Sequence, residues 1–145
     1  AAVLEAKAEV DAAQGKTPAR APSGEVRVLV VEADHAVRRL SVSRIEALGY
    51  RTLAAGNAAE ALAILGTEPG VDVLFADIVM PGAMNGHDLA RKVKADYPQV
   101  SILLTSGFAG GIGSTAAAEF SILHKPYRQN DLAMRLRLLV SRQRG

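Results

Sequence analysis

The sequence has no cysteine and no long apolar run. Without cysteine, a disulfide framework and a thiolate metal site are both excluded. No stretch approaches the ~20 apolar residues that a bilayer-spanning helix needs. The segment Ala1–Gln14 carries acidic side chains where a secretory signal peptide has its apolar core. These absences favour a cytoplasmic protein that does not contact a membrane through this chain.

An excess of one charge is also missing. The chain has 17 lysine and arginine residues and 15 aspartate and glutamate residues, and its net charge of +2 is too small to indicate nucleic-acid binding. The surplus is local, because basic residues gather near the C-terminus against only Asp131: Lys125, Arg128, Arg135, Arg137, Arg142 and Arg144. A basic end can attract an acidic partner. The simpler interpretation is a solvated terminal helix, whose cations suit the negative end of its dipole.

Length and composition favour one globular domain. The chain has 145 residues, 49% hydrophobic and 22% charged, and typical domains hold ~100–150 residues. Residues 1–24 are predicted to form a separate segment, in which an alanine-rich helix with little to bury precedes a linker rich in glycine, proline and serine. We therefore expect the compact domain to cover residues 25–145.

Five short apolar segments are predicted to be strands. They are rich in β-branched residues and are bounded by polar or turn residues: Val26–Val31, Arg51–Ala55, Val71–Ala76, Val100–Thr105 and Phe120–Leu123. Their apolar residues are nearly continuous rather than alternating, which is typical of a parallel sheet buried on both faces.

Helical patterns separate and follow these strands. The first predicted helix has an apolar stripe and is ended by Gly49; the stripe is Val37, Leu40, Ile45 and Leu48. The last predicted helix has a stripe of its own, made of Leu132, Leu136, Leu139 and Val140. Three further helices are predicted at Ala58–Leu65, opened by a capping arrangement of Asn57 and Glu60, at His87–Asp96, and near Thr115–Glu119. The resulting order predicts an α/β doubly wound domain, which binds ligands at the carboxyl ends of its strands.

Polar residues with matching chemistry follow these strand ends. They are three acids, a hydroxyl and an ammonium: Glu32, Asp34, Asp77, Thr105 and Lys125. Crowded carboxylates repel one another unless a cation is present, and a divalent cation with oxygen ligands, typically Mg²⁺, relieves that repulsion. Such a cation and Lys125 would neutralise charge on a transferred phosphoryl group, to which Thr105 could donate a hydrogen bond.

Four segments carry a resemblance to a known family. They are VLVVEADHAVRRL, DVLFADIVMPGAMNGHDLA, ILLTSGF and HKPY, in that order along the chain. Together they resemble the successive motifs of response-regulator receiver domains over about residues 25–140. The resemblance implies a flavodoxin-like (βα)5 fold with a five-stranded parallel sheet of order 2-1-3-4-5. The wording MPGAMNG and the ending KPY are most similar to receivers attached to hybrid sensor histidine kinases.

The resemblance also implies a role for each site residue. Asp77 matches the phosphoacceptor, Thr105 the hydroxyl that contacts the phosphoryl group, and Lys125 the lysine that pairs with the acids and the phosphate. Mg²⁺ would be held by Glu32, Asp77 and the backbone carbonyl of Val79. The implied partner is a histidine kinase or a histidine phosphotransfer protein, a homodimer is compatible with the family, and no enzymatic activity is implied beyond self-phosphorylation and its reversal. The bond before Pro126 is expected to be cis.

Two positions depart from the family pattern. The family usually has a pair of acids after the first strand, and Ala33 stands where the second acid binds the metal, so Mg²⁺ affinity is expected to be weakened. Asp34 follows at once, and it either joins the site acids or caps the first helix. Ile122 stands where the family often has an aromatic residue that changes rotamer on activation, so signal output would have to use an aliphatic side chain.

Three functions follow from these observations. The first is a phosphoacceptor receiver domain, either a stand-alone protein or a piece of a longer kinase. The second is a degenerate receiver, a phosphorylation-independent interaction module in which Ala33 has disabled the metal site. The third is a small hydrolase with Asp77 as nucleophile, which the lack of an acid at Val79 disfavours.

Other candidate residues have simpler interpretations. The segment Gly111–Ala116 fits a dinucleotide loop, but it follows the fourth strand, so a loop beside the site is the better interpretation. The histidines His35, His87 and His124 have no metal-ligand spacing and are expected at the surface. Tyr127 is expected to pack at the start of the last helix.

Overall fold

The computed structural model describes residues 26–80, 82–107 and 119–144. The predicted N-terminal segment, the glycine-rich stretch 111–116 and most of the predicted short helix at 115–119 lie outside these ranges. No helix within the described ranges is long and apolar enough to cross a membrane.

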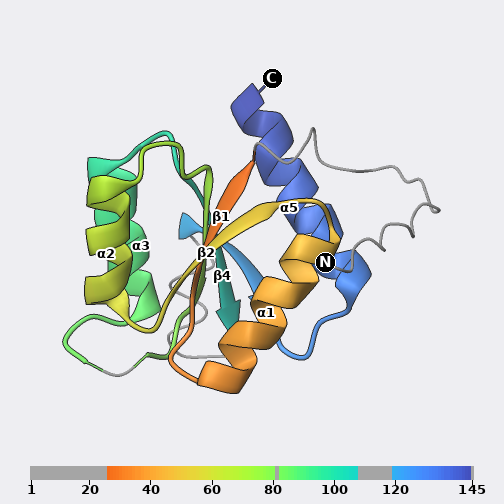
Figure 1. Ribbon diagram of the computed structural model, residues 1–145, viewed down its shortest axis with the longest axis horizontal. Coiled ribbons are helices and arrows are strands. Elements are labelled where there is room, and N and C mark those ends of the chain that lie inside the picture. Colours follow the sequence, from red (N-terminus) through yellow and green to blue (C-terminus); the bar gives the residue numbers. More distant parts are fainter. Residues whose placement is uncertain (1–25, 81, 108–118, 145) are drawn as a thin grey trace.

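Five parallel strands form one sheet, in the order β2-β1-β3-β4-β5 (Figure 1). This confirms the predicted topology, and each strand lies within two residues of its predicted bounds: β1 (Arg27–Val31), β2 (Arg51–Ala55), β3 (Val73–Asp77), β4 (Ser101–Ser106) and β5 (Ser121–His124). Every residue of β3 is buried. That pattern is expected of a central strand with helices on both faces.

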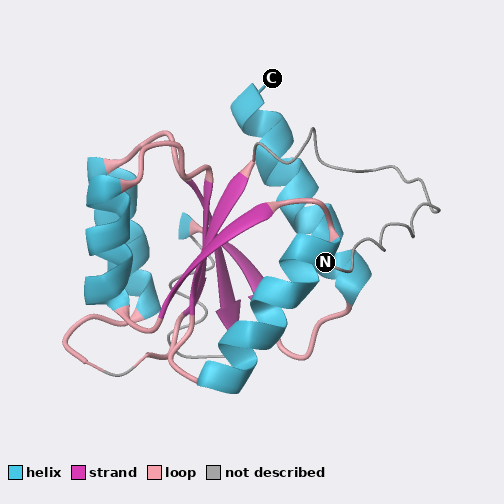
Figure 2. Ribbon diagram, in the orientation of Figure 1, coloured by secondary structure: helices cyan, strands magenta, loops and turns pink. Residues whose placement is uncertain are grey.

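Helices cover both faces of the sheet. They are α1 (His35–Ala47), α2 (Ala58–Thr67), α3 (Gly86–Asp96) and α5 (Gln129–Arg144). Figure 2 shows α2 and α3 on one side of the strands and α1 and α5 on the other. The core is therefore divided into two layers, and alternate residues of β3 serve them: Leu74 and Ala76 belong to the α2–α3 layer, whereas Val73 and Phe75 belong to the α1–α5 layer.

Local signals explain where the helices begin and end. Gly49 follows α1 with φ of 100°, a conformation that favours glycine. The Asn57 side chain accepts from the Glu60 N–H at 2.8 Å, as predicted, and the Glu60 carboxylate accepts from the Gly56 N–H at 2.7 Å. Asn85 caps α3, and its side chain accepts from the Asp88 N–H at 2.8 Å. The start of α3 bears on the site because it directly follows the loop after β3.

The predicted apolar stripe of α1 is partly wrong. Val37 and Leu40 are 37% and 52% exposed, whereas Ser41 and Ile45 are buried. Of the predicted stripe, Ile45 is buried and Leu48 partly buried, so the buried line shares these two positions but passes through Ser41 in place of Val37 and Leu40. A serine on the buried face misled a prediction that used only apolar side chains. The stripe of α5 is confirmed, because Leu132, Leu136, Leu139 and Val140 are all buried.

Candidate functional site

The strand order brings the predicted site residues to one edge of the sheet. Glu32 directly follows β1, Asp77 ends β3, Thr105 lies near the end of β4, and Lys125 directly follows β5. Because β1, β3, β4 and β5 are successive neighbours in a parallel sheet, their carboxyl ends meet at this edge. Glu32, Asp77 and Thr105 are buried, with exposures of 8%, 9% and 3%.

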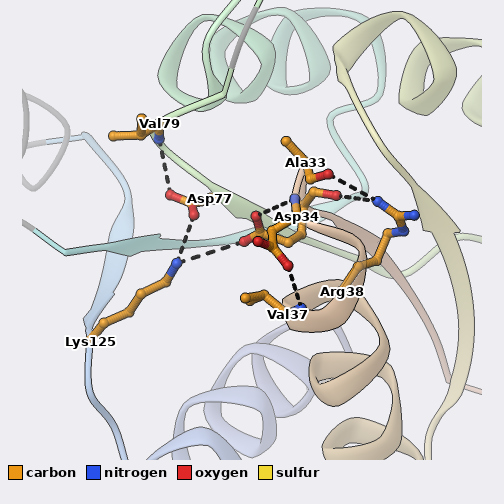
Figure 3. A network of polar contacts seen from close by, with 8 residues as sticks. Ala33, Asp34, Val37, Arg38, Asp77, Val79 and Lys125 are labelled. Atoms are coloured by element: carbon orange, nitrogen blue, oxygen red, sulfur yellow. Dashed lines mark hydrogen bonds and ion pairs between the residues drawn. The ribbon is translucent and has the colours of Figure 1, made fainter.

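Both oxygens of the Asp77 carboxylate have a donor. The Lys125 Nζ donates to Oδ2 at 2.7 Å, and the Val79 N–H donates to Oδ1 at 3.0 Å (Figure 3). The N–H comes from the loop that follows β3, two residues after Asp77. The carboxylate is thus held by its own loop and by the ammonium of Lys125, which follows β5 and lies 48 residues along the chain.

Glu32 shares the same ammonium. Its Oε1 lies 3.7 Å from the Lys125 Nζ, and its Oε2 accepts from the Asp34 N–H at 3.0 Å. Burial raises the pKa of the Glu32 carboxyl above its ordinary value; the Asp34 N–H opposes this rise, Asp77 adds to it and Lys125 opposes it. The net direction is upward, so the protonated form of Glu32 is more favoured here than it is for a carboxyl in water.

Lys125 is held in place by backbone as well as by charge. Its N–H donates to the Ser106 carbonyl at 2.8 Å, and the peptide bond to Pro126 is cis, as predicted. Burial alone lowers the pKa of the Lys125 ammonium, but the hydrogen bond and charge of Asp77, together with Glu32, outweigh it and raise the pKa. The ammonium therefore remains charged over the neutral range.

Thr105 lies beside Asp77 in the sheet. The two residues are register partners on neighbouring strands, which places them about 4.8 Å apart. The Thr105 carbonyl accepts from the Ile78 N–H at 2.9 Å, so the pairing of β4 continues past Asp77. The hydroxyl-bearing residue is thus adjacent to the carboxylate, as the sequence predicted.

Asp34 and Ala33 contribute no metal ligand of the kind that the family pattern supplies. The Asp34 side chain accepts from the Val37 N–H at 3.0 Å and caps α1, which is one of the two roles that the sequence left open. Ala33 is exposed and has only a methyl group. Within the described residues, no group of three or more histidine, cysteine, aspartate or glutamate side chains could hold a metal ion.

The donors that are present nevertheless fit Mg²⁺ in chemical type. Glu32 and Asp77 provide carboxylate oxygens, and Val79 provides a backbone carbonyl two residues after Asp77; oxygen is the ligand atom that Mg²⁺ prefers. Burial is the main cause of the raised pKa of Glu32, and the neighbouring Asp77 carboxylate adds to the rise. The set is one carboxylate short of the family pattern, and the expected weakening of Mg²⁺ affinity stays a prediction.

A glycine that the sequence analysis did not single out shapes the site. Gly86 begins α3, and its N–H donates to the Ile78 carbonyl at 2.8 Å. A Cβ on Gly86 would lie 2.1 Å from the backbone oxygen of Asp77. The helix can approach the phosphoacceptor candidate this closely only because residue 86 has no side chain.

The prediction that all three histidines lie at the surface is wrong for His87. His35 and His124 are exposed, but His87 is only 9% exposed. Its Nε2 lies 2.6 Å from Glu119 Oε1, and its ring packs edge-on against Phe120. As the second residue of α3, His87 faces the segment before β5, and an isolated histidine in the sequence carries no signal of such a partner. Tyr127 packs as expected, against Phe75 and beneath the Arg44 guanidinium.

Comparisons with known proteins bear on the family and the fold. The family model described as "Response regulator receiver domain" matches residues 28–137. The sensor kinase CckA of Brucella abortus is 33% identical over 125 residues, which are 83% of this chain and 13% of the kinase. The receiver protein CpdR of the same organism is 36% identical over 109 residues, 73% of this chain and 89% of CpdR. The chain therefore spans only a small part of the kinase but most of CpdR.

Solved structures show the same fold. A response regulator receiver domain protein from Clostridium thermocellum has a TM-score of 0.74 and 23% identity, with 82% of this chain and 97% of that chain covered. The response regulator TrrA from Thermotoga maritima, solved in complex with Mg(2+)-BeF, has a TM-score of 0.71 and 23% identity, with 79% and 98% covered.

Proposed function

The chain belongs to the response regulator receiver domain family of two-component systems, and on that premise we propose that Asp77 accepts a phosphoryl group from a phosphohistidine. The observation that carries the proposal is the cluster at the sheet edge. One ammonium contacts both Asp77 and Glu32, and Thr105 is the register partner of Asp77. The donor is a histidine kinase or a histidine phosphotransfer protein.

The phosphoryl transfer is a substitution at phosphorus. A carboxylate oxygen of Asp77 forms the new O–P bond, and the P–N bond of the phosphohistidine breaks with its electron pair on the ring nitrogen. The imidazole leaves as a neutral ring that keeps the proton of its other nitrogen or takes one from solvent. The Val79 N–H fixes the carboxylate orientation, and Lys125 offsets the negative charge that the phosphoryl oxygens bring. When bound, Mg²⁺ held by Glu32, Asp77 and the Val79 carbonyl would supply further charge neutralisation.

The aspartyl phosphate would act as a switch rather than as an intermediate of turnover. It carries ~2 negative charges where the carboxylate carried one, and it brings new acceptor oxygens, which draw the Lys125 ammonium and the Thr105 hydroxyl toward the phosphoryl group. Lys125 directly follows β5, and β5 is tied to α5 because Arg135 Nη1 donates to the Ile122 carbonyl at 2.8 Å. A shift of Lys125 therefore changes which conformation of the β5–α5 surface is populated, and partner proteins bind to that surface.

A degenerate receiver is the second candidate. Ala33 gives this site one carboxylate fewer than the family pattern, and Lys125 already pairs with both carboxylates that remain. Under this alternative the domain keeps its fold and interaction surface without accepting phosphate.

Intact-protein mass after incubation with acetyl phosphate separates the two. A single Mg²⁺-dependent phosphate adduct that is absent in Asp77→Asn supports the phosphoacceptor. If neither acetyl phosphate nor a phosphorylated histidine phosphotransfer protein produces an adduct at any Mg²⁺ concentration, the degenerate receiver is correct.

A further inference from the structure

The guanidinium of Arg38 contacts the loop that carries Glu32. Its Nη1 donates to the Glu32 carbonyl at 2.7 Å and lies 3.5 Å from the Ala33 carbonyl (Figure 3). Its Nη2 lies 3.0 Å from His35 Nδ1, which must accept because a guanidinium has no acceptor atom. Within the described part of the chain, Arg38 forms no ion pair with a carboxylate. Its donors are therefore directed at backbone carbonyls and one ring nitrogen.

One peptide group connects Arg38 to the site. The peptide between Ala33 and Asp34 has its carbonyl beside Arg38, and its N–H donates to Glu32 Oε2 at 3.0 Å. A trans peptide is planar, with the C=O and N–H directed to opposite sides. Figure 3 shows Arg38 on one side of the loop and Asp77 with Lys125 on the other. Whatever orients the carbonyl therefore also orients the N–H.

We propose that Arg38 is a positioning residue for Glu32: it holds the loop carbonyls so that the Asp34 N–H points at the Glu32 carboxylate. The short hydrogen bond to the Glu32 carbonyl anchors the first peptide of the loop, and the longer contact to Ala33 biases the second. The Glu32 carboxylate is thereby held facing Lys125 and Asp77. The consequence for Mg²⁺ and phosphoryl transfer rests on the proposed function, whereas the effect on the peptide does not.

The surroundings of Arg38 suit this role. A Cβ on Gly56 would lie 3.4 Å from Arg38 Nη1, so the guanidinium lies against the turn that follows β2. Arg38 is half-buried and its hydrogen bond to the Glu32 carbonyl is partly buried, which limits the water available to replace it there, whereas its contact with the Ala33 carbonyl is exposed. Because Ala33 provides no carboxylate, the remaining acid depends more on its own orientation than it would in a site with the full set.

The experiment compares Arg38→Gln with Arg39→Gln. Arg39 is the exposed neighbour on α1, so the control removes the same charge from the same helix without touching the loop. Hydrogen exchange of the Asp34 amide and the Kd for Mg²⁺ are measured by NMR on the uniformly labelled chain. Arg38→Gln is expected to speed exchange of the Asp34 amide by about tenfold and to weaken Mg²⁺ binding by about tenfold, the lower end of effects seen for residues that orient metal ligands. Arg39→Gln should change neither.

A third variant, Arg38→Lys, guards against general unfolding. It keeps a donor near the Glu32 carbonyl and is expected to recover part of both losses, while exchange of amides in β3 stays unchanged in all variants. Equal Asp34 exchange in the Arg38→Gln and Arg39→Gln variants would overturn the proposal. If the wild type accepts no phosphate, the exchange measurement alone decides, so failure of the proposed function and failure of this inference are distinguishable.

Discussion

The Lys125 Nζ lies 2.7 Å from Asp77 Oδ2 and 3.7 Å from Glu32 Oε1, so a single ammonium serves two buried carboxylates. Replacing it in Lys125→Met leaves both carboxylates without a cation. Breaking a buried pair costs ~3–5 kcal/mol, and because the Lys125 side chain is 33% exposed, we expect the free energy of unfolding to fall by about 1–3 kcal/mol. Urea unfolding without Mg²⁺ measures it.

Two comparisons make this prediction specific. Lys92→Met removes an exposed ammonium that lies 3.0 Å from Asp96 in α3, and it should cost only ~0.5 kcal/mol or less. Added Mg²⁺ should restore more stability to Lys125→Met than to the wild type, because the bare carboxylates bind the cation more tightly. Equal losses in the two lysine variants would contradict a special role for Lys125.

The contact of α3 with the end of β3 predicts a severe effect of Gly86→Ala. The new Cβ would lie 2.1 Å from the Asp77 oxygen and 2.7 Å from the Ile78 Cα, both backbone atoms that cannot move away as a side chain could. We expect a loss of about 2–3 kcal/mol, in the range of overpacked sites, and a loss of phosphate acceptance. Thermal unfolding and acetyl phosphate labelling measure the two effects.

Gly66→Ala is the matched control for that substitution. Gly66 lies in α2, is exposed and has nothing within 4 Å of the added Cβ. The change should leave stability unaltered or raise it by up to ~1 kcal/mol, because alanine is the better helix former. Similar destabilisation in both variants would mean that the close approach at Gly86 is not the cause.

The strands and the polar residues at the edge of the sheet could be predicted because each depends on a short, unbroken segment of sequence. Each strand is a short apolar run, and Glu32, Asp77, Thr105 and Lys125 all follow or end such runs. Once the strand order is known, parallel strands must bring these ends together. The caps at Gly49 and Asn57 were also predictable, since each depends on residues within a few positions.

Features that depend on a partner far along the chain were not predictable in this way. His87 was expected at the surface because nothing near it in sequence suggests Glu119, which lies 32 residues away. The exposed side of α1 was misplaced because a serine, Ser41, occupies the buried line. The contacts of Arg38 are hydrogen bonds to backbone carbonyls. Because every residue has a carbonyl, the sequence gives no sign of which ones Arg38 contacts.

The His87–Glu119 pair predicts a pH effect on stability. The hydrogen bond from His87 is the main cause that lowers the pKa of the Glu119 carboxyl below its ordinary value of 4.5. The folded state therefore binds fewer protons at this site than the unfolded state, so stability rises with pH through this window. The contribution is present above about pH 4.5 and is lost as the pH falls through the lowered value.

Glu119→Gln keeps the shape of this side chain but cannot be charged. We expect the variant to be less stable than the wild type near pH 6 and the difference to shrink as the pH falls below 4. Chemical unfolding at several pH values gives the two curves. A difference that does not change with pH would show that the charge of Glu119 contributes nothing and that only its shape matters.

The substitution Ala33→Asp restores the missing acid, and it tests whether the number of carboxylate ligands limits the affinity of the site for Mg²⁺. A third carboxylate beside Glu32 and Asp77 is expected to tighten Mg²⁺ binding by roughly 10–100-fold. It should also lower stability without metal, because Lys125 cannot neutralise three charges. Isothermal titration with Mg²⁺ measures the first effect, and Ser43→Asp, which adds the same charge at an exposed position of α1, is the control.

A tighter Kd together with faster labelling by acetyl phosphate would identify Ala33 as the cause of a weak receiver. An unchanged Kd would mean that Glu32, Asp77 and the Val79 carbonyl already suffice, and the degenerate alternative would lose its main support.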